Sequence, residues 1–233
     1  YTPDNWYDEA FSNSFRQEYN ASISGSSEKL NYYASLGYLD DGGFVSNSGY
    51  KRYTGRTNIE YEYNKYIKLT TNMSYTQGIS QTANYDADTY GSSTNIFYLA
   101  NMIAPIYPLY VRNADGSIMK ENGRVVYDAN QTAQSRPAFV GNAIRDNEFN
   151  KARRISDVFH GQWGAVVTPL EGLTLNANFT ADIYNSRYNK LYSPYGSSSG
   201  TDGAAYVSHS RTQSVNQQYF ANYSHTFANV HNM

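Results

Sequence analysis

Hydrophobic and polar residues alternate one by one along four consecutive stretches between Phe15 and Tyr75. Successive side chains of a β-strand point to opposite faces of the sheet, so each stretch predicts a strand with one apolar and one polar face. Gln17 is the one polar residue on the apolar face of the first stretch. The predicted strands cover residues 15–25, 30–38, 52–64 and 67–76, and their apolar faces carry Tyr19, Ala21, Ile23, Tyr32, Ala34, Leu36, Tyr38, Tyr53, Ile59, Tyr61, Leu69, Met73 and Tyr75, among others.

The alternation returns in the last third of the chain and predicts three more strands, at residues 155–167, 173–183 and 215–227. Strands of about ten residues cross the hydrocarbon of a bilayer when they are tilted. The first four strands are joined alternately by tight turns and a long loop, as in outer-membrane barrels. The pattern therefore predicts seven antiparallel strands of a transmembrane β-barrel. In the most regular strand we expect Leu175, Phe179 and Ile183 to face lipid, and Asn176, Thr180 and Asp182 to face the lumen.

Residues 77–151 lack the two-residue period, and so long a connection predicts structure of its own. Ser92 or Ser93 is placed to cap a helix near residues 95–103, which Pro105 ends. Asp115-Gly116 predicts a hairpin turn, and residues 121–123 predict another turn. We therefore expect an ordered extracellular subdomain here.

A helix before the first strand and a polar loop between the last two strands complete the predicted organisation. Asp4 is placed to cap a helix that runs to Ser14. A polar loop rich in Ser and Gly is expected from Ser186 to Ser214. The chain thus divides into a short helical lead-in (1–14), four strands (15–76), the extracellular loop subdomain (77–151) and three further strands (152–233).

Composition narrows the function classes. The 233 residues include 25 tyrosines, which favour strands and the aromatic girdles of barrels, and no cysteine. A net charge of −2 argues against a nucleic-acid partner. No run of about 18 apolar residues is present to form a transmembrane helix. A soluble, secreted β-sandwich that binds carbohydrate or mediates adhesion fits the same composition and remains the alternative.

A series of short motifs gives the chain a resemblance to a known family. They are residues 5–9 (NWYDE), 22–25 (SISG), 28–29 (EK), 31–38 (NYYASLGY), 43–45 (GFV), 48–58 (SGYKRYTGRTN), 113–117 (NADGS) and 170–173 (LEGL). In this order they resemble the SusC/RagA family of TonB-dependent outer-membrane transporters of Bacteroidetes. The resemblance covers most of the chain and is densest in residues 5–76.

The resemblance implies a barrel of about 22 strands with an N-terminal plug, a TonB box and a SusD-like surface lipoprotein as partner. It also implies import of oligosaccharides or peptides through the cell outer membrane, with energy delivered by TonB. The chain shows neither the plug nor the TonB box, so we expect it to be an early and middle piece of the barrel. TonB would then act through an N-terminal region absent from this chain.

The long loop supplies one candidate set of substrate-contacting residues. Aromatic rings stack on the apolar faces of sugars, while Asp and Asn side chains bind hydroxyls. The alternative is that the tyrosines pack within the loop itself. The set is Tyr85, Asp86, Asp88, Tyr90, Asn95 and Tyr98.

No catalytic or metal site is predicted from the sequence. The four histidines lie far apart and lack ligand spacing. Asp86-Ala87-Asp88 lacks the later glycine and glutamate of a calcium loop. Neither a Gly-x-Ser-x-Gly elbow nor a phosphate-binding loop is present. We therefore expect a protein that is not an enzyme and carries no cofactor.

Overall fold

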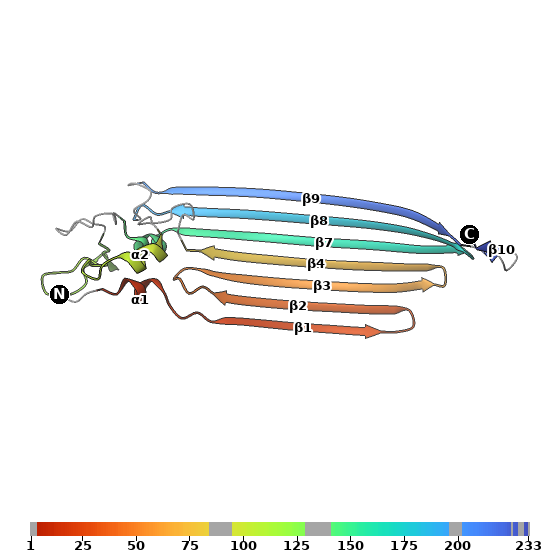
Figure 1. The fold of residues 1–233 in the computed structure, drawn as a ribbon, viewed down its shortest axis with the longest axis horizontal. Coiled ribbons are helices and arrows are strands. Elements are labelled where there is room, and N and C mark those ends of the chain that lie inside the picture. The colour runs from red at the N-terminus through yellow and green to blue at the C-terminus, as the bar shows by residue number, and fades with distance from the viewer. Residues whose placement is uncertain are drawn as a thin grey trace.

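Seven long antiparallel strands form one curved sheet, and short helices gather at one end of it (Figure 1). The computed structural model describes residues 4–83, 95–128, 141–195, 202–224, 226–227 and 231–232. Each long strand pairs with the next one along the chain. They are β1 (Arg16–Ser26), β2 (Leu30–Gly42), β3 (Gly49–Asn64), β4 (Ile67–Thr82), β7 (Lys151–Leu170), β8 (Leu173–Tyr192) and β9 (Ala204–Tyr223).

All seven predicted strands are present, but most are longer than the alternation indicated. β2 and β4 continue past their predicted ends, and β7, β8 and β9 have 20 residues each. The predicted loop from Ser186 to Ser214 is wrong, because β8 continues to Tyr192 and β9 begins at Ala204. Towards the helical end both faces of the sheet carry many polar residues. The alternation is therefore lost there while the backbone ladder continues.

The strand register gathers the predicted apolar residues on one face. Tyr19 lies opposite Tyr38, which lies opposite Tyr53, and Trp163 lies opposite Phe179. Directly paired residues share a face. Along β3 this apolar band runs from Tyr53 to Tyr61, about 26 Å at roughly 3.3 Å per residue. At a strand tilt of about 40° this band is about 20 Å tall along the membrane normal, close to the roughly 25 Å lipid-facing band of a transmembrane barrel, which is flanked by aromatic girdles.

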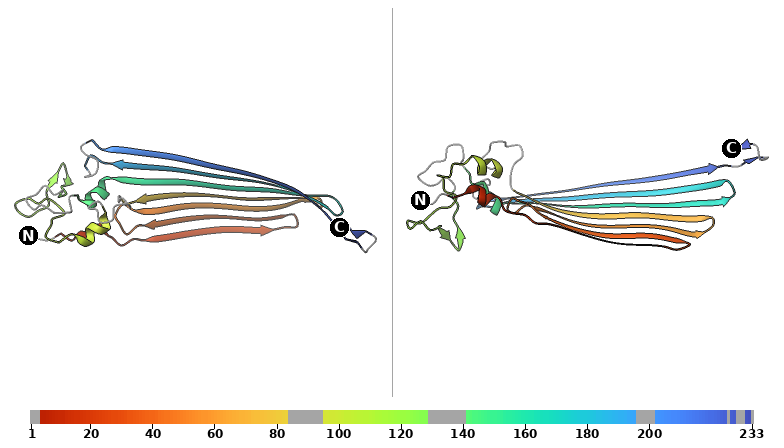
Figure 2. Two further views of the ribbon diagram at one scale, coloured as in Figure 1. Left: turned by 45° about the horizontal axis from the view of Figure 1, so that its top comes forward. Right: turned by 60° about the horizontal axis from the view of Figure 1, so that its bottom comes forward.

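The β-sandwich alternative is wrong. A sandwich packs two sheets face to face, whereas the described residues form one seven-stranded sheet and two two-stranded ribbons. The two views in Figure 2 show that the helices stay at one end and leave both faces of the sheet uncovered along the strands.

The helical end has a small hydrophobic core of its own. The buried residues include Trp6, Val45, Leu99, Leu109 and Ile144, so the lead-in, the β2–β3 loop and the long loop pack together. Among the described residues, no helix is long and apolar enough to cross a membrane. The elements here are α1 (Trp6–Ala10), α2 (Ile96–Met102), β5 (Lys120–Glu121), β6 (Arg124–Val125) and α3 (Ala143–Phe149); β10 (Thr226–Phe227) and β11 (His231–Asn232) follow β9.

The first helix differs from its prediction. α1 ends at Ala10, and its cap is Asn5 rather than Asp4. Asp4 instead accepts a hydrogen bond from the Leu109 amide at 2.7 Å and pairs with Arg112. A buried carboxylate gains more from a guanidinium and buried amides than from an exposed helix end. Asp4 therefore joins the lead-in to the long loop.

The long loop contains the predicted helix and turns. α2 is capped by Asn95, while Ser92 and Ser93 lie outside the described residues. The turn at Asp115-Gly116 is confirmed, with Gly116 at a φ of 85° that favours glycine. The turn at residues 121–123 joins β5 to β6. α3 has no counterpart among the elements predicted from the sequence.

Candidate substrate-contact surface

The face opposite the apolar band is a polar wall that carries ion-paired side chains. Lys68 on β4 lies 2.7 Å from Glu60 on β3, and Arg52 lies 3.3 Å from Glu18 on β1. The side chains of both pairs are more than a third exposed, so each pair stabilises the sheet by at most about 1 kcal/mol. Their effect is to keep this face hydrated. It is the surface that a polar solute inside a barrel would meet.

Near the helical end this wall carries a cluster that we call the inner-wall patch, namely Arg154, Ser186, Tyr188, Lys190 and Tyr206. The Arg154 guanidinium lies 4.9 Å from the centroid of the Tyr188 ring, and its Nη1 donates to the Ser186 hydroxyl at 3.2 Å. The Tyr188 and Tyr206 rings lie 6.1 Å apart. Lys190 lies directly opposite Tyr206 in the strand register.

The inner-wall patch is a combination of aromatic surface and fixed positive charge. Exposed ring faces stack on sugar rings or on peptide side chains. A guanidinium held over a ring keeps free N–H groups that bind carboxylates or hydroxyls. The patch is therefore suited to hold a polar oligomer that passes along the wall.

A second hollow, of about 440 Å³, lies in the long-loop subdomain between the β5–β6 hairpin and α3. Arg124 lies 5.8 Å from the centroid of the Tyr195 ring, and that ring is 6.0 Å from the ring of Phe149. Arg145 also lines the hollow. The helical end of the sheet thus carries a second pairing of aromatic rings with arginine.

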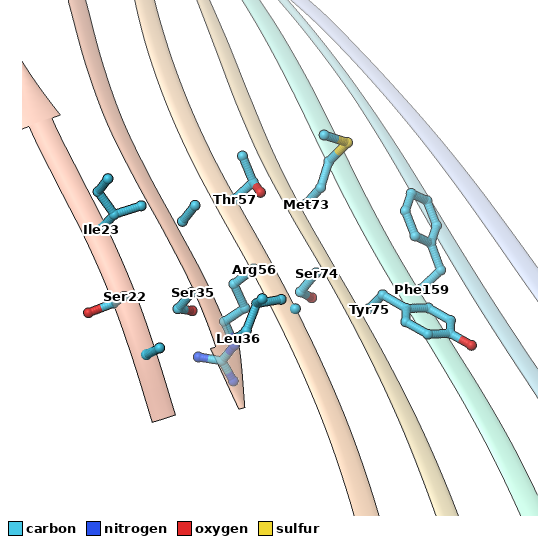
Figure 3. Close-up of a pocket in the computed structure, with 13 residues that line it drawn as sticks. Ser22, Ile23, Ser35, Leu36, Arg56, Thr57, Met73, Ser74, Tyr75 and Phe159 are labelled. Atoms are coloured by element: carbon cyan, nitrogen blue, oxygen red, sulfur yellow. The ribbon is translucent and has the colours of Figure 1, made fainter. Parts of the chain in front are cut away.

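The apolar face carries a larger hollow, of about 630 Å³, over β1–β4 and β7. Figure 3 shows Ile23, Leu36, Met73, Tyr75 and Phe159 around it. It is open and almost wholly apolar, and it lies in the band that matches the hydrocarbon. It therefore suits lipid chains and not a polar substrate.

The predicted contact set is only partly within the described residues. Tyr85, Asp86, Asp88 and Tyr90 lie outside them. The Asn95 side-chain oxygen accepts hydrogen bonds from the amides of Phe97 and Tyr98 as the cap of α2. Tyr98 is half-buried in that helix. A role for this set in substrate contact stays a prediction.

The inner-wall patch was missed from the sequence because most of it falls in the stretch interpreted as a loop. One signal was available there. Tyr184, Tyr188 and Tyr192 are spaced four residues apart, which places all three on one face of a strand.

Comparison with curated proteins gives matches over most of the chain. It is 29% identical over 221 residues to the TonB-dependent receptor SusC of Bacteroides thetaiotaomicron, which covers 82% of this chain and 22% of that protein. It is 27% identical over 179 residues to the TonB-dependent receptor P26 of Formosa agariphila, which covers 75% and 16% respectively. The chain thus spans less than a quarter of the length of these relatives. No protein-family model matches it.

Comparison with solved structures gives the same result for the fold. The RagAB peptide importer in its closed-closed state matches with a TM-score of 0.67 and 26% identity, over 97% of this chain and 24% of that chain. A second structure, of the RagAB peptide transporter, matches with a TM-score of 0.66 over 99% of this chain. Sequence and fold together confirm that the chain resembles a barrel segment of the SusC/RagA type.

Proposed function

We propose that this segment forms roughly a third of the barrel wall of a TonB-dependent transporter that imports oligosaccharides or peptides. One observation carries the proposal. A single sheet has one apolar face of bilayer height and one charged, hydrated face, and it matches RagAB over 97% of this chain. The transporter resides in the outer membrane of a Bacteroidetes-type bacterium. We assign it transport and not catalysis.

The orientation of the barrel in the membrane follows from the position of the turns. The tight turns at residues 27–29, 65–66 and 171–172 mark the periplasmic end of the strands, as in other barrels. The helical end and the inner-wall patch are then extracellular. An incoming oligomer meets the aromatic rings and Arg154 before it reaches the part of the barrel inside the bilayer. A SusD-like lipoprotein covers this mouth, and TonB acts through a region outside this segment.

The test compares neighbouring residues of β9 that face opposite ways in the full-length protein. The double variant Tyr188→Ala/Tyr206→Ala removes the rings of the inner-wall patch. Val207→Ala removes an exposed side chain next to Tyr206 from the outer face. Two aromatic contacts of about 0.5–1.5 kcal/mol each correspond to roughly a five- to a hundredfold loss of affinity. We expect that loss for labelled glycans or peptides in the double variant and none in the control.

Two results would count against the proposal. One is equal uptake by the double variant and the Val207→Ala control, which would remove the patch from the substrate path. The other is recovery of the full-length protein in a soluble fraction after cell disruption, which would remove the membrane function altogether.

A further inference from the structure

Beyond the band that matches the hydrocarbon, the outer face of β7–β9 carries basic residues, other polar residues and a few apolar ones. The register places every second residue beyond Phe159, Ile183 and Val215 on this face, including the apolar Ile155, Leu191 and Val207 and the acidic Asp157. Four of those outward positions are cationic and exposed. They are Lys151, Arg153, Arg187 and Arg211, which we call the outer basic patch.

The cations of this patch outnumber the neighbouring acids, of which Asp157 attracts Arg187 electrostatically. Among the described residues, none of the four forms an ion pair with a carboxylate. The nearest outward acid in the register is Asp157, which accepts hydrogen bonds from Tyr75 at 2.6 Å and Gln77 at 2.8 Å. On the opposite face Lys68 and Arg52 both have carboxylate partners. The four cations of the outer basic patch therefore outnumber the one acid, Asp157, on the same part of the outer face.

The height of Arg187 places it at the lipid headgroups. Arg187 lies four residues beyond Ile183, about 13 Å along the strand at roughly 3.3 Å per residue. A strand tilt of about 40° reduces this to about 10 Å along the membrane normal. A long arginine side chain that bends towards the bilayer covers much of that distance. The Arg187 guanidinium thus reaches the layer that holds lipid phosphates.

We propose that the outer basic patch binds the phosphate groups of anionic lipids in the outer leaflet. The inference rests on the proposed membrane function. Arginine matches phosphate with paired hydrogen bonds, and a row of cations on neighbouring strands spans more than one phosphate. The continuity of the patch with the lipid-facing band favours a lipid over a soluble acidic protein. Free phosphate offers the same chemistry without the acyl chains.

The experiment uses the full-length protein, stripped of lipid in detergent and titrated with phosphatidylglycerol or phosphatidylcholine while native mass spectrometry counts bound lipids. The triple variant Arg153→Gln/Arg187→Gln/Arg211→Gln removes most of the patch. The control is Arg154→Gln, the neighbour of Arg153 that faces the inner wall. Each arginine near an anionic surface contributes about a factor of five, so the triple variant should lose roughly a hundredfold in preference for phosphatidylglycerol. The control should keep that preference.

Further measurements separate lipid binding from the other outcomes. Inorganic phosphate at millimolar concentration should not displace the lipid; displacement would mean that the patch binds phosphate alone. An unchanged lipid preference in the triple variant, or an equal loss in Arg154→Gln, would overturn the inference while leaving transport intact. Failure of the wild-type protein to insert into vesicles of the two lipids would overturn the proposed function and this inference together.

Discussion

Phe179 and Thr180 are neighbours on β8 whose side chains face opposite media. The Phe179 ring lies 5.6 Å from that of Trp163 on the apolar face, whereas Thr180 lies opposite Gln162 on the polar face. Phe179 is also near the middle of the apolar run from Leu173 to Ile183. Moving one residue along the strand therefore changes the medium that a side chain meets from lipid to water.

This gives a paired prediction for the full-length protein. Phe179→Arg should lower the free energy of unfolding by about 2–4 kcal/mol, because it puts a charge near the bilayer midplane. Thr180→Arg should change it little, since the charge enters the hydrated lumen. Urea unfolding in lipid vesicles measures both. Equal tolerance at the two sites would mean that the assignment of faces is wrong.

Two tyrosines of the long-loop subdomain give a pH prediction. Burial, together with the Glu9 carboxylate, raises the pKa of Tyr110 to about 12. Burial and a hydrogen bond to Glu148 likewise raise the pKa of Tyr127. The folded state favours the neutral phenols, so their contribution to stability is complete below about pH 10 and is lost as the pH rises towards 12.

An absorbance titration of phenolate, followed together with near-ultraviolet circular dichroism, tests this. We expect Tyr110 and Tyr127 to ionise late, and the subdomain to lose its tertiary signal as they do so. Tyr110→Phe should remove one of the late steps. Ionisation of all tyrosines near pH 10 would contradict the prediction.

At the scale of elements, the lead-in is tied to the long loop by one buried carboxylate. Asp4→Ala should destabilise the helical end by about 3 kcal/mol, because it leaves Arg112 and the Leu109 amide without their acceptor. Asp8→Ala is the control, since Asp8 is exposed on α1, and it should change stability by less than about 0.5 kcal/mol. Limited proteolysis of the 109–127 stretch in the intact protein reports the difference. Equal cleavage rates in both variants would show that Asp4 does not hold the subdomain.

Single strands also show how much of the fold could be predicted from the sequence. Inside the apolar band the two-residue period is imposed by lipid on one side and water on the other, so residues such as Leu175 and Asn176 reveal their faces. Beyond the band both sides meet water, and a strand continues only because its partner does. The extensions that carry Tyr188 and Tyr206 were therefore interpreted as loop. Asp4 was misassigned because its partners lie more than a hundred residues away.

For the whole molecule, the open edges of the sheet make a further prediction. β1 and β9 each have one neighbour in the seven-stranded sheet, and each unpaired backbone group costs several kcal/mol in lipid. The 233-residue segment alone, refolded in detergent, should therefore give no compact species with heat-modifiable gel mobility. The full-length protein, as the control, should give one. Solute uptake by liposomes containing the segment alone would instead make it a small barrel in its own right.

In the proposed transporter, the length of β7 and β8 sets how far the barrel wall rises above the bilayer. From Phe159 to Lys151 the wall continues for about 26 Å along the strand, or about 20 Å above the hydrocarbon at a tilt of about 40°. In the proposed barrel the entrance is therefore a collar that stands above the lipid headgroups rather than level with them. An extended peptide of roughly six residues spans this collar at about 3.3 Å per residue. Ligand length then decides whether one molecule touches the rim and the bilayer-level wall at the same time.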